Sequence, residues 1–504
     1  MRAQGDVSLG AGVDITTLGG DFLVSGANDT GAVFGGAADG AGSFTSSSTS
    51  TIITTGKNDT AGGTVTISSA VRNPGTGNTT GNISIGGDIT TSGGTVTSSG
   101  AGKAGGNVSI EARNAGTLTI STGADITTTG SAAHTSGAGG AGGTVTLNTA
   151  ATALTLNDTL ISTAGGAGAG GGAVGNGGTI TVSDPLSIAT GEVQFNTGTG
   201  STAGDITTST IDGATSLNLT YGGGTLSTGL IGSNTALTGL TYSGTALTLD
   251  NNITLNSGAL TISAPVTLGS DITVTTNNGA IDFNSTIDGG QSLTLVSGSG
   301  AITLDGATGG NTALSALTIN SAGTGTIEIA NIEGVSGATA IGNTNTATIT
   351  LDGTTYSTDD TQTYTAATGQ NIDITGAATF TTTNDNISFA TSGVDLANNG
   401  TTTINTGTGA GTVTFGAAIE GNSASAPFND LLVITSGTGT VTFTGAVGAT
   451  NALGGLDVNS SAGNATITFT STIGDTGNAG VVGTTAIGNT NTADLNFNGA
   501  TYSF

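Results

Sequence analysis

The 504-residue chain has no cysteine and no tryptophan, and only 4% of its residues are aromatic and 7% charged. Without cysteine it can form no disulfide, no thiolate metal site and no cysteine nucleophile. The strong helix formers glutamate, lysine, arginine, glutamine and methionine are scarce, which excludes a helix-rich fold. The length would allow several globular domains, but so few aromatics argue against cores of the ordinary kind.

Basic residues are nearly absent as well. Five lysines and arginines stand against 32 acidic residues, and the formal net charge is −27. The basic residues are Arg2, Lys57, Arg72, Lys103 and Arg113. A surface of this charge repels phosphate backbones and anionic membranes, so we expect no nucleic-acid partner.

Long apolar runs are also missing. Residues 1–8 contain no apolar stretch of the kind found in a signal peptide. No run approaches the ~20 residues that cross a bilayer, so we expect no transmembrane segment in this chain. We expect the chain to be exported, as a piece of a longer protein whose targeting signal lies outside it.

The chain is rich in glycine, with 92 residues, and hydrophobic residues still reach 35%. Composition of this kind raises the possibility of disorder. However, valine, isoleucine and leucine fall in short runs that alternate with threonine or serine. Such alternation is typical of strands with one buried face, and threonine suits the solvent face of a strand.

Residues 1–189 carry one family of glycine-rich repeats. The strand Gly-x-Val/Ile-x-apolar recurs at spacings of 43, 37 and 35 residues, beginning at Gly63, Gly106, Gly143 and Gly178. A second strand follows each of the first three, for example at Leu118, and an Asp-Ile-Thr-Thr element begins at Asp14, Asp88 and Asp125. Each unit of about 35–43 residues is therefore predicted to hold three strands and a glycine loop such as 165–178.

Residues 190–504 carry a longer module in three copies, near Ser209, Ser285 and Ile419. Each copy contains Ile-Asp/Glu-Gly, then Leu-x-Leu or its equivalent, and then a loop ending in Ala-Leu. Seven extra residues coincide with segment 422–428, and the later strands stay in step. A solenoid tolerates such insertions because each coil contacts only its neighbours.

These repeats predict an all-β fold, a right-handed parallel β-helix, with tandem β-sandwich repeats as the alternative. Stacked valine, isoleucine and leucine fill a narrow interior without aromatics. The module offsets of 76 and 132 residues lie near multiples of 19, which predicts coils of about that length.

The motifs resemble the repetitive region of filamentous haemagglutinin-type bacterial adhesins, which are exported by two-partner or autotransporter routes. The resemblance is carried by the Gly-Gly-x-Val-x-Ile and Asp-Ile-Thr-Thr strands of residues 1–185, and by the module of 209–504 with Thr361-Gln-Thr-Tyr364. It implies a β-helical fibre at the cell surface with roles in adhesion, aggregation or biofilm. The family's Asn-Pro-Asn-Gly-type secretion motif is missing, and no receptor-binding motif matches.

Candidate catalytic residues are few. His134 is the only histidine, and we interpret it as an ordinary loop residue because no nucleophile or orienting acid accompanies it. Asp359 and Asp360 form an acidic pair of the kind a polysaccharide hydrolase or lyase uses. Such enzymes add histidine and basic residues, and neither follows His134. We interpret the pair as a solvated turn before the strand with Tyr364.

Other binding chemistry is weakly indicated. Acidic residues favour calcium as a metal, but they are scattered, which favours a diffuse cation atmosphere. The Asn-Thr-Asn-Thr segments at Asn343 and Asn489 are interpreted as turns. Thr-x-Thr runs would suit an ice-binding face, yet asparagine and aspartate interrupt them. We therefore assign no catalytic, cofactor-binding or metal-binding residue and no cofactor.

Three functions follow as hypotheses. The first is a non-enzymatic, secreted or surface-exposed adhesin rod that contacts surface glycans or proteins. The second is a filament subunit that meets identical subunits end to end, since no capping helix is visible in the sequence. The third, least favoured, is a polysaccharide-active enzyme.

Overall fold

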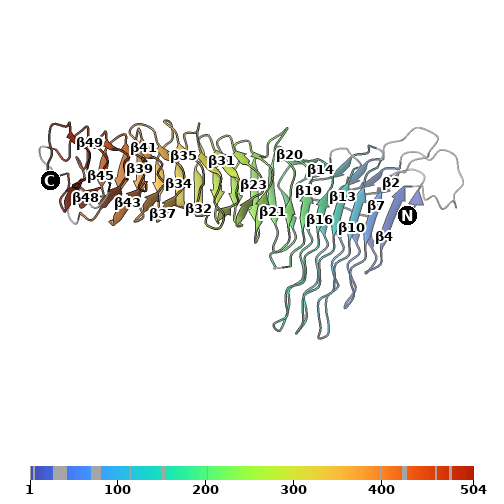
Figure 1. The fold of residues 1–504 in the computed structure, drawn as a ribbon. Helices are drawn as coiled ribbons and strands as arrows, with labels where there is room; N and C mark the ends of the chain where they lie inside the picture. Colours follow the sequence, from blue (N-terminus) through green and yellow to red (C-terminus); the bar gives the residue numbers. More distant parts are fainter. Residues whose placement is uncertain are drawn as a thin grey trace. The chain divides into compact units, whose positions relative to one another are not determined.

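The structure, a computed structural model, describes residues 2–3, 6–26, 42–69, 81–113, 115–149, 154–200, 202–397, 399–422, 428–459, 463–475 and 480–504. These residues form short strands joined by turns and divide into two compact units, Met1–Gly258 and Ala259–Phe504 (Figure 1). In each unit the strands pair in parallel with the strand one coil away. This confirms the predicted parallel β-helix and excludes β-sandwiches, whose sheets are antiparallel. No helix in the described part is long and apolar enough to cross a membrane.

The first unit has three strands in each of its successive coils, one in each of three sheets. The first sheet contains β1 (Arg2–Ala3), β4 (Phe22–Gly26), β7 (Val65–Ser68), β10 (Val108–Glu111), β13 (Val145–Asn148), β16 (Ile180–Val182), β19 (Ile206–Thr208) and β22 (Leu226–Ser227). The second contains β2 (Val7–Leu9), β5 (Phe44–Ser46), β8 (Ile83–Ile85), β11 (Leu118–Ile120), β14 (Leu154–Asn157), β17 (Leu186–Thr190) and β20 (Ile211–Gly213). The third contains β3 (Asp14–Thr16), β6 (Thr51–Ile53), β9 (Ile89–Thr90), β12 (Ile126–Thr127), β15 (Leu160–Ser162), β18 (Val193–Asn196), β21 (Ser216–Thr220) and β23 (Gly239–Ser243). Strands β24 (Leu247–Leu249) and β25 (Ile253–Thr254) follow.

Equivalent positions of the sequence repeats are paired with one another in the sheets of this unit. Val108 of β10 pairs with Val65 on one side and Val145 on the other, and Val145 pairs with Ile180. The Asp-Ile-Thr-Thr elements are strands of the third sheet, as Ile89 pairs with Ile126. The order of strand, strand, strand and glycine loop is therefore confirmed.

Glycine in the repeat is required by close stacking of the coils. A Cβ on Gly143 would lie 2.0 Å from the carbonyl oxygen of Gly106, and one on Gly178 would lie 2.0 Å from that of Gly143. The second threonine of Asp-Ile-Thr-Thr belongs to the same contact: the buried Thr128 hydroxyl donates to the Gly143 carbonyl at 2.7 Å. Thr54, Thr91 and Thr163 make the equivalent bond to Gly63, Gly106 and Gly178. The threonine motif and the glycine motif recur together because the threonine hydroxyl and the glycine carbonyl are the two partners of one hydrogen bond.

The glycine loops form extended arms that project from the strands of the first unit (Figure 1). Neighbouring arms are hydrogen-bonded through their backbones. The Ser131 amide donates to the Lys103 carbonyl at 2.8 Å, and the Gly166 amide donates to the Gly140 carbonyl at 2.8 Å. A Cβ on Gly166 would lie 1.9 Å from the Ser131 carbonyl oxygen. The arms are thus packed backbone against backbone, which leaves no room for a side chain at positions such as Gly166.

The second unit again has three lines of strands. One sheet contains β28 (Ile272–Thr275), β31 (Ser292–Val296), β33 (Ala316–Ile319), β35 (Thr339–Gly342), β38 (Gln362–Thr365), β41 (Ile387–Ala390), β44 (Val413–Phe415), β47 (Val441–Phe443), β49 (Ile467–Phe469) and β51 (Leu495–Phe497). A second line contains β26 (Leu260–Ile262), β29 (Ile281–Phe283), β32 (Ile302–Thr308), β34 (Ile327–Ile332), β36 (Ile349–Leu351), β39 (Asn371–Ile374), β42 (Gly393–Leu396) and β45 (Ile419–Gly421). The third contains β27 (Val266–Leu268), β30 (Ile287–Asp288), the ends of β32 and β34, β37 (Thr355–Ser357), β40 (Thr379–Thr381), β43 (Thr401–Asn405), β46 (Leu431–Thr435), β48 (Gly455–Val458) and β50 (Thr485–Ile487).

The coils are longer than the length of about 19 residues that the module offsets suggested. Ile281 pairs with Ile302, which is 21 residues later, and Ile302 pairs with Ile327, which is 25 later. Coil length varies because the turns differ while the strands keep register. The boundary predicted at 189/190 separates two families of sequence repeat, whereas the two compact units of the structure divide at 258/259. The division into repeat families therefore stays a prediction. Residues 423–427 of the inserted segment, with Pro427, lie outside the described residues.

The aromatic residues of the second unit form a buried stack. Phe389, Phe415, Phe443 and Phe469 occupy the same position of β41, β44, β47 and β49. Their rings are parallel within 7°, with centroids 4.5–5.3 Å apart, and the side chains are at most 1% exposed. The scarce aromatics are thus concentrated where register alone lets one ring lie on the next.

We predict that Gly143→Ala destabilises the first unit strongly. Its Cβ would meet the Gly106 carbonyl oxygen at 2.0 Å, and backbone cannot move aside. Overpacking of this kind typically costs about 1–3 kcal/mol. Urea denaturation measures the loss. The matched control is Gly10→Ala, which has no atom within 4 Å of the added Cβ; equal losses for the two variants would contradict the stacking argument.

Candidate functional site

The acidic residue of the repeated module is a cap for the loop of the next coil. In the first copy, Asp212 Oδ1 accepts the backbone N–H groups of Asn234 and Thr235, at 2.7 and 3.1 Å. Asp288 accepts those of Asn311 and Thr312 at 2.8 and 3.1 Å. In the third copy Glu420 Oε2 accepts those of Thr450 and Asn451, at 3.0 and 2.7 Å. Ile-Asp/Glu-Gly therefore recurs with its loop because the carboxylate satisfies the loop's amides.

These bonds also set the acidity of the two caps that are aspartates. Burial by itself raises the pKa of Asp212, but hydrogen bonds from Asn234, Thr235 and Ser233 outweigh it and hold the pKa below its ordinary value. The pKa of Asp288 is lowered in the same way, with burial opposed by the bonds from Asn311 and Thr312. The caps are structural acceptors.

The two Asn-Thr-Asn-Thr segments are turns, as predicted. The Asn343 side-chain amide donates to the carbonyls of Asn320 and Gly323, at 2.6 and 2.7 Å. Asn489 donates to those of Asn459 and Gly463, at 2.6 and 3.0 Å. Each asparagine thus bonds its turn to the turn of the preceding coil.

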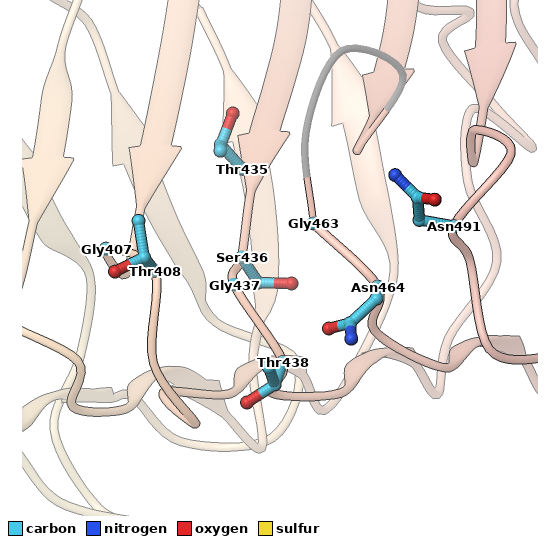
Figure 2. Close-up of a pocket in the computed structure, with 9 residues that line it drawn as sticks. All are labelled: Gly407, Thr408, Thr435, Ser436, Gly437, Thr438, Gly463, Asn464 and Asn491. Atoms are coloured by element: carbon cyan, nitrogen blue, oxygen red, sulfur yellow. The ribbon is translucent and has the colours of Figure 1, made fainter.

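A shallow groove of about 500 Å³ crosses the turns that follow β43, β46, β48 and β50. It is lined by Gly407, Thr408, Thr435, Ser436, Gly437, Thr438, Gly463, Asn464 and Asn491 (Figure 2). Thr438, Asn464 and Asn491 are exposed, whereas Ser436 is buried and donates to the Gly439 carbonyl at 3.0 Å. The lining offers hydroxyl and amide groups without charge. Such groups suit a neutral, hydroxyl-rich ligand held by hydrogen bonds.

A column of carboxylates faces outward on the second line of strands. Asp373 of β39 pairs in register with Asp395 of β42, and Asp395 pairs with Glu420 of β45. Parallel neighbours are about 4.8 Å apart, and the chain has no lysine or arginine after Arg113. Burial, together with the charges of Asp373 and Glu420, raises the pKa of Asp395, although Asn371 donates to it at 2.6 Å. Burial raises the pKa of Asp373.

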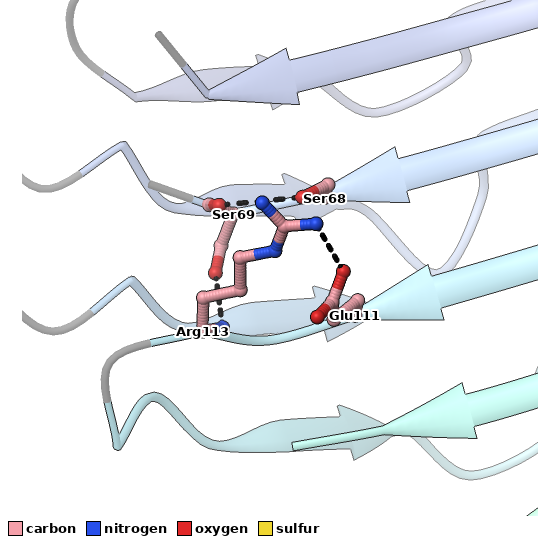
Figure 3. Close-up of polar contacts among 4 residues, drawn as sticks. All are labelled: Ser68, Ser69, Glu111 and Arg113. Carbon is pink, nitrogen blue, oxygen red and sulfur yellow. Dashed lines mark hydrogen bonds and ion pairs between the residues drawn. The ribbon is translucent and has the colours of Figure 1, made fainter. Parts of the chain in front are cut away.

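Among the basic residues in the described part of the first unit, Arg113 forms an ion pair. The Arg113 guanidinium pairs with Glu111 at 2.5 Å, and its backbone N–H donates to Ser69 Oγ at 2.9 Å (Figure 3). The ion pair joins two residues of one coil, and the bond from the Arg113 amide to Ser69 connects this coil to the preceding one. Arg72 lies outside the described residues.

The sequence candidates for catalysis belong neither to the lining of the groove nor to the carboxylate column. His134 is exposed in the glycine arm between Thr128 and Gly143. Asp359 is exposed in the turn before β38, and Asp360 accepts the Thr361 amide at 2.6 Å, which confirms the predicted turn. The described residues include no group of three or more His, Asp or Glu placed to hold a metal. The groove and the carboxylate column were missed from the sequence because coils of unequal length bring their members together.

Comparisons with protein-family models, curated proteins and solved structures found no match to this chain. The resemblance to filamentous haemagglutinin-type adhesins therefore depends on the sequence motifs alone.

We predict that Asp288→Ala loosens the Asn311–Thr312 loop and costs about 1 kcal/mol, because two amides lose a charged acceptor at an exposed site. Asp288→Asn is the matched control, since its oxygen can still accept. Because the Asp288 pKa is lowered, its contribution is present above the ordinary value of 3.8 and is lost as the pH falls through the folded value. Hydrogen exchange of the two amides measures the change; unchanged exchange in Asp288→Ala would refute the cap.

Asp395→Asn is predicted to stabilise the second unit at neutral pH. The Asp395 pKa is raised, so the carboxylate's unfavourable contribution appears as the pH rises through the folded value and is absent below the ordinary value of 3.8. The gain should therefore shrink to nothing in acid. Urea midpoints from about pH 3 to about pH 7 test this. Asp352→Asn, at an exposed turn, is the control; an equal gain in both variants would contradict the column's role.

Proposed function

We propose that the chain is a non-enzymatic segment of a secreted or surface-exposed bacterial adhesin, in which β-helical coils present and space adhesive surface. The observation that supports this most is the register of the coils. It repeats outward side chains about every 4.8 Å, so that a partner with repeating chemistry meets many equivalent groups. Individually weak contacts then add to a strong attachment.

The groove of Figure 2 is the contact site that we propose, with a neutral surface glycan as its ligand. Its hydroxyl and amide groups come from four successive turns, which suits an extended chain of sugars better than a compact molecule. The acidic character of the whole chain, with a net charge of −27, favours neutral partners over anionic ones. The sequence motifs shared with filamentous haemagglutinin-type adhesins support the same assignment.

A self-assembling extracellular filament is the second candidate, and one observation favours it. Leu495 and Phe497 of β51 are 42% and 41% exposed, whereas their partners in β49, Ile467 and Phe469, are at most 1% exposed. Phe497 stacks on Phe469 with centroids 5.3 Å apart. A further coil laid on β51, from this chain or from a second copy, would bury both side chains.

Beads coated with the purified chain test the adhesin proposal. We expect them to be retained on cells and on neutral glycan arrays more than beads coated with an inert protein. Asn464→Trp should reduce retention because it fills the groove, whereas Thr261→Trp, on the outward side of β26, should not. Equal retention of wild-type and inert beads would refute adhesion. Electron microscopy of the same preparation distinguishes separate particles from the filaments of the second candidate.

A further inference from the structure

The strands of the second unit gather threonine onto one outward surface. Between the two inward residues of each strand lies one outward residue, and register places these in a column: Thr363, Ser388, Thr414, Thr442 and Thr468. Threonines flank the column on the three strands β44, β47 and β49, at Thr412, Thr440, Thr444, Thr466 and Thr470. We call the outward residues of β44, β47 and β49, with these flanking residues, the threonine face.

The phenylalanine stack makes this face regular. Phe415, Phe443 and Phe469 lie directly behind it. Each follows a threonine of the face in sequence, and Phe443 and Phe469 are followed by another. Their rings are within 7° of parallel. Sheets normally twist, and a flat sheet needs side-chain ladders of this kind to hold it. Successive coils therefore present their threonines in the same orientation.

The face is a two-dimensional lattice of hydroxyls and methyl groups, in which the Thr412 hydroxyl donates to Asn386 and the Thr468 hydroxyl accepts from Asn496. Its rows repeat about every 4.8 Å across the strands and about every 6.7 Å between alternate residues of a strand. The Thr414 and Thr442 hydroxyls bond to no other described residue, and both side chains are partly exposed. Its outward positions carry no charge, whereas the carboxylates of Asp373, Asp395 and Glu420 lie on another line of strands.

A lattice of this kind fits a partner that repeats in two dimensions and carries no charge. Crystalline polysaccharide would be held by sugar rings stacked on aromatics, but the phenylalanines of these strands point inward and are buried. Oxygen positions on faces of hexagonal ice repeat at distances similar to those of the threonine lattice, and hydroxyls can hold water in such positions while methyl groups lie between them.

We propose that the threonine face binds ice. Thr-x-Thr runs are short in each coil, so no single stretch of sequence displays the surface; the stacking of coils creates it. The face and the groove share no residue, although the groove residues Thr438 and Asn464 lie two residues before Thr440 and Thr466 of the face.

Ice recrystallisation and thermal hysteresis of the full chain test the proposal. The wild-type chain should inhibit recrystallisation, and Thr442→Tyr, at the centre of the face, should abolish this by holding the ice away. Thr414→Tyr, one coil earlier, is a second variant with the same expected loss. The matched control is Thr350→Tyr, an outward threonine of β36 that pairs with Asp373; it should keep full activity. Circular dichroism confirms that each variant used is folded.

Loss of activity in the two face variants and its retention in the control would support the proposal. It would be overturned by a wild-type chain that leaves recrystallisation unchanged, or by equal activity in all variants. Binding to crystalline cellulose or chitin in place of ice would overturn it as well, and would assign the face to a polysaccharide surface.

Discussion

The structure depends on one constraint, the in-register backbone hydrogen bonding of each coil to the next. Parallel strands separated by about 4.8 Å bring a residue directly against its counterpart one coil away. Each position must therefore be compatible with a copy of itself. Glycine stacks on glycine at Gly106 and Gly143 because a Cβ would strike the neighbouring carbonyl. Phenylalanine stacks on phenylalanine at Phe415 and Phe443 because flat rings pack well at that separation.

In-register stacking also determines which polar residues are stabilising and which are destabilising at a given position. Buried hydroxyls are stabilised where they have an acceptor, as Thr128 has in Gly143. Others, such as those of Thr197 and Thr308, have no hydrogen-bond partner in the described part of the chain. Stacked carboxylates are unfavourable, since burial and then the neighbouring charges of Asp373 and Glu420 raise the pKa of Asp395. Neutral threonines can stack without such a penalty. The outward columns of the second unit therefore differ in chemistry, and these differences separate a charged surface from an uncharged one.

Much of the fold was predictable from particular residues. The recurrence of an apolar residue at Val65, Val108, Val145 and Ile180 predicted four strands, and these positions are paired in the sheet. The module at Ser209, Ser285 and Ile419 was recognised as a unit, although its reason, a carboxylate cap on the following loop, was not. Coil length was misjudged because module offsets measure several coils together. The groove was not predicted because Thr408 and Asn491 are distant in sequence and only the stacking of turns brings them together.

The sequence by itself determined what points inward: its alternation, its glycines and its repeated motifs were enough for a β-helix and for most strand partners. The tertiary structure alone decided which outward residues share a surface. The physical reason is that turns vary in length while strands keep register, so the spacing from Thr414 to Thr442 differs from that between Thr442 and Thr468. Neighbours on the surface are therefore set by hydrogen bonding between coils, which counting along the chain does not reveal.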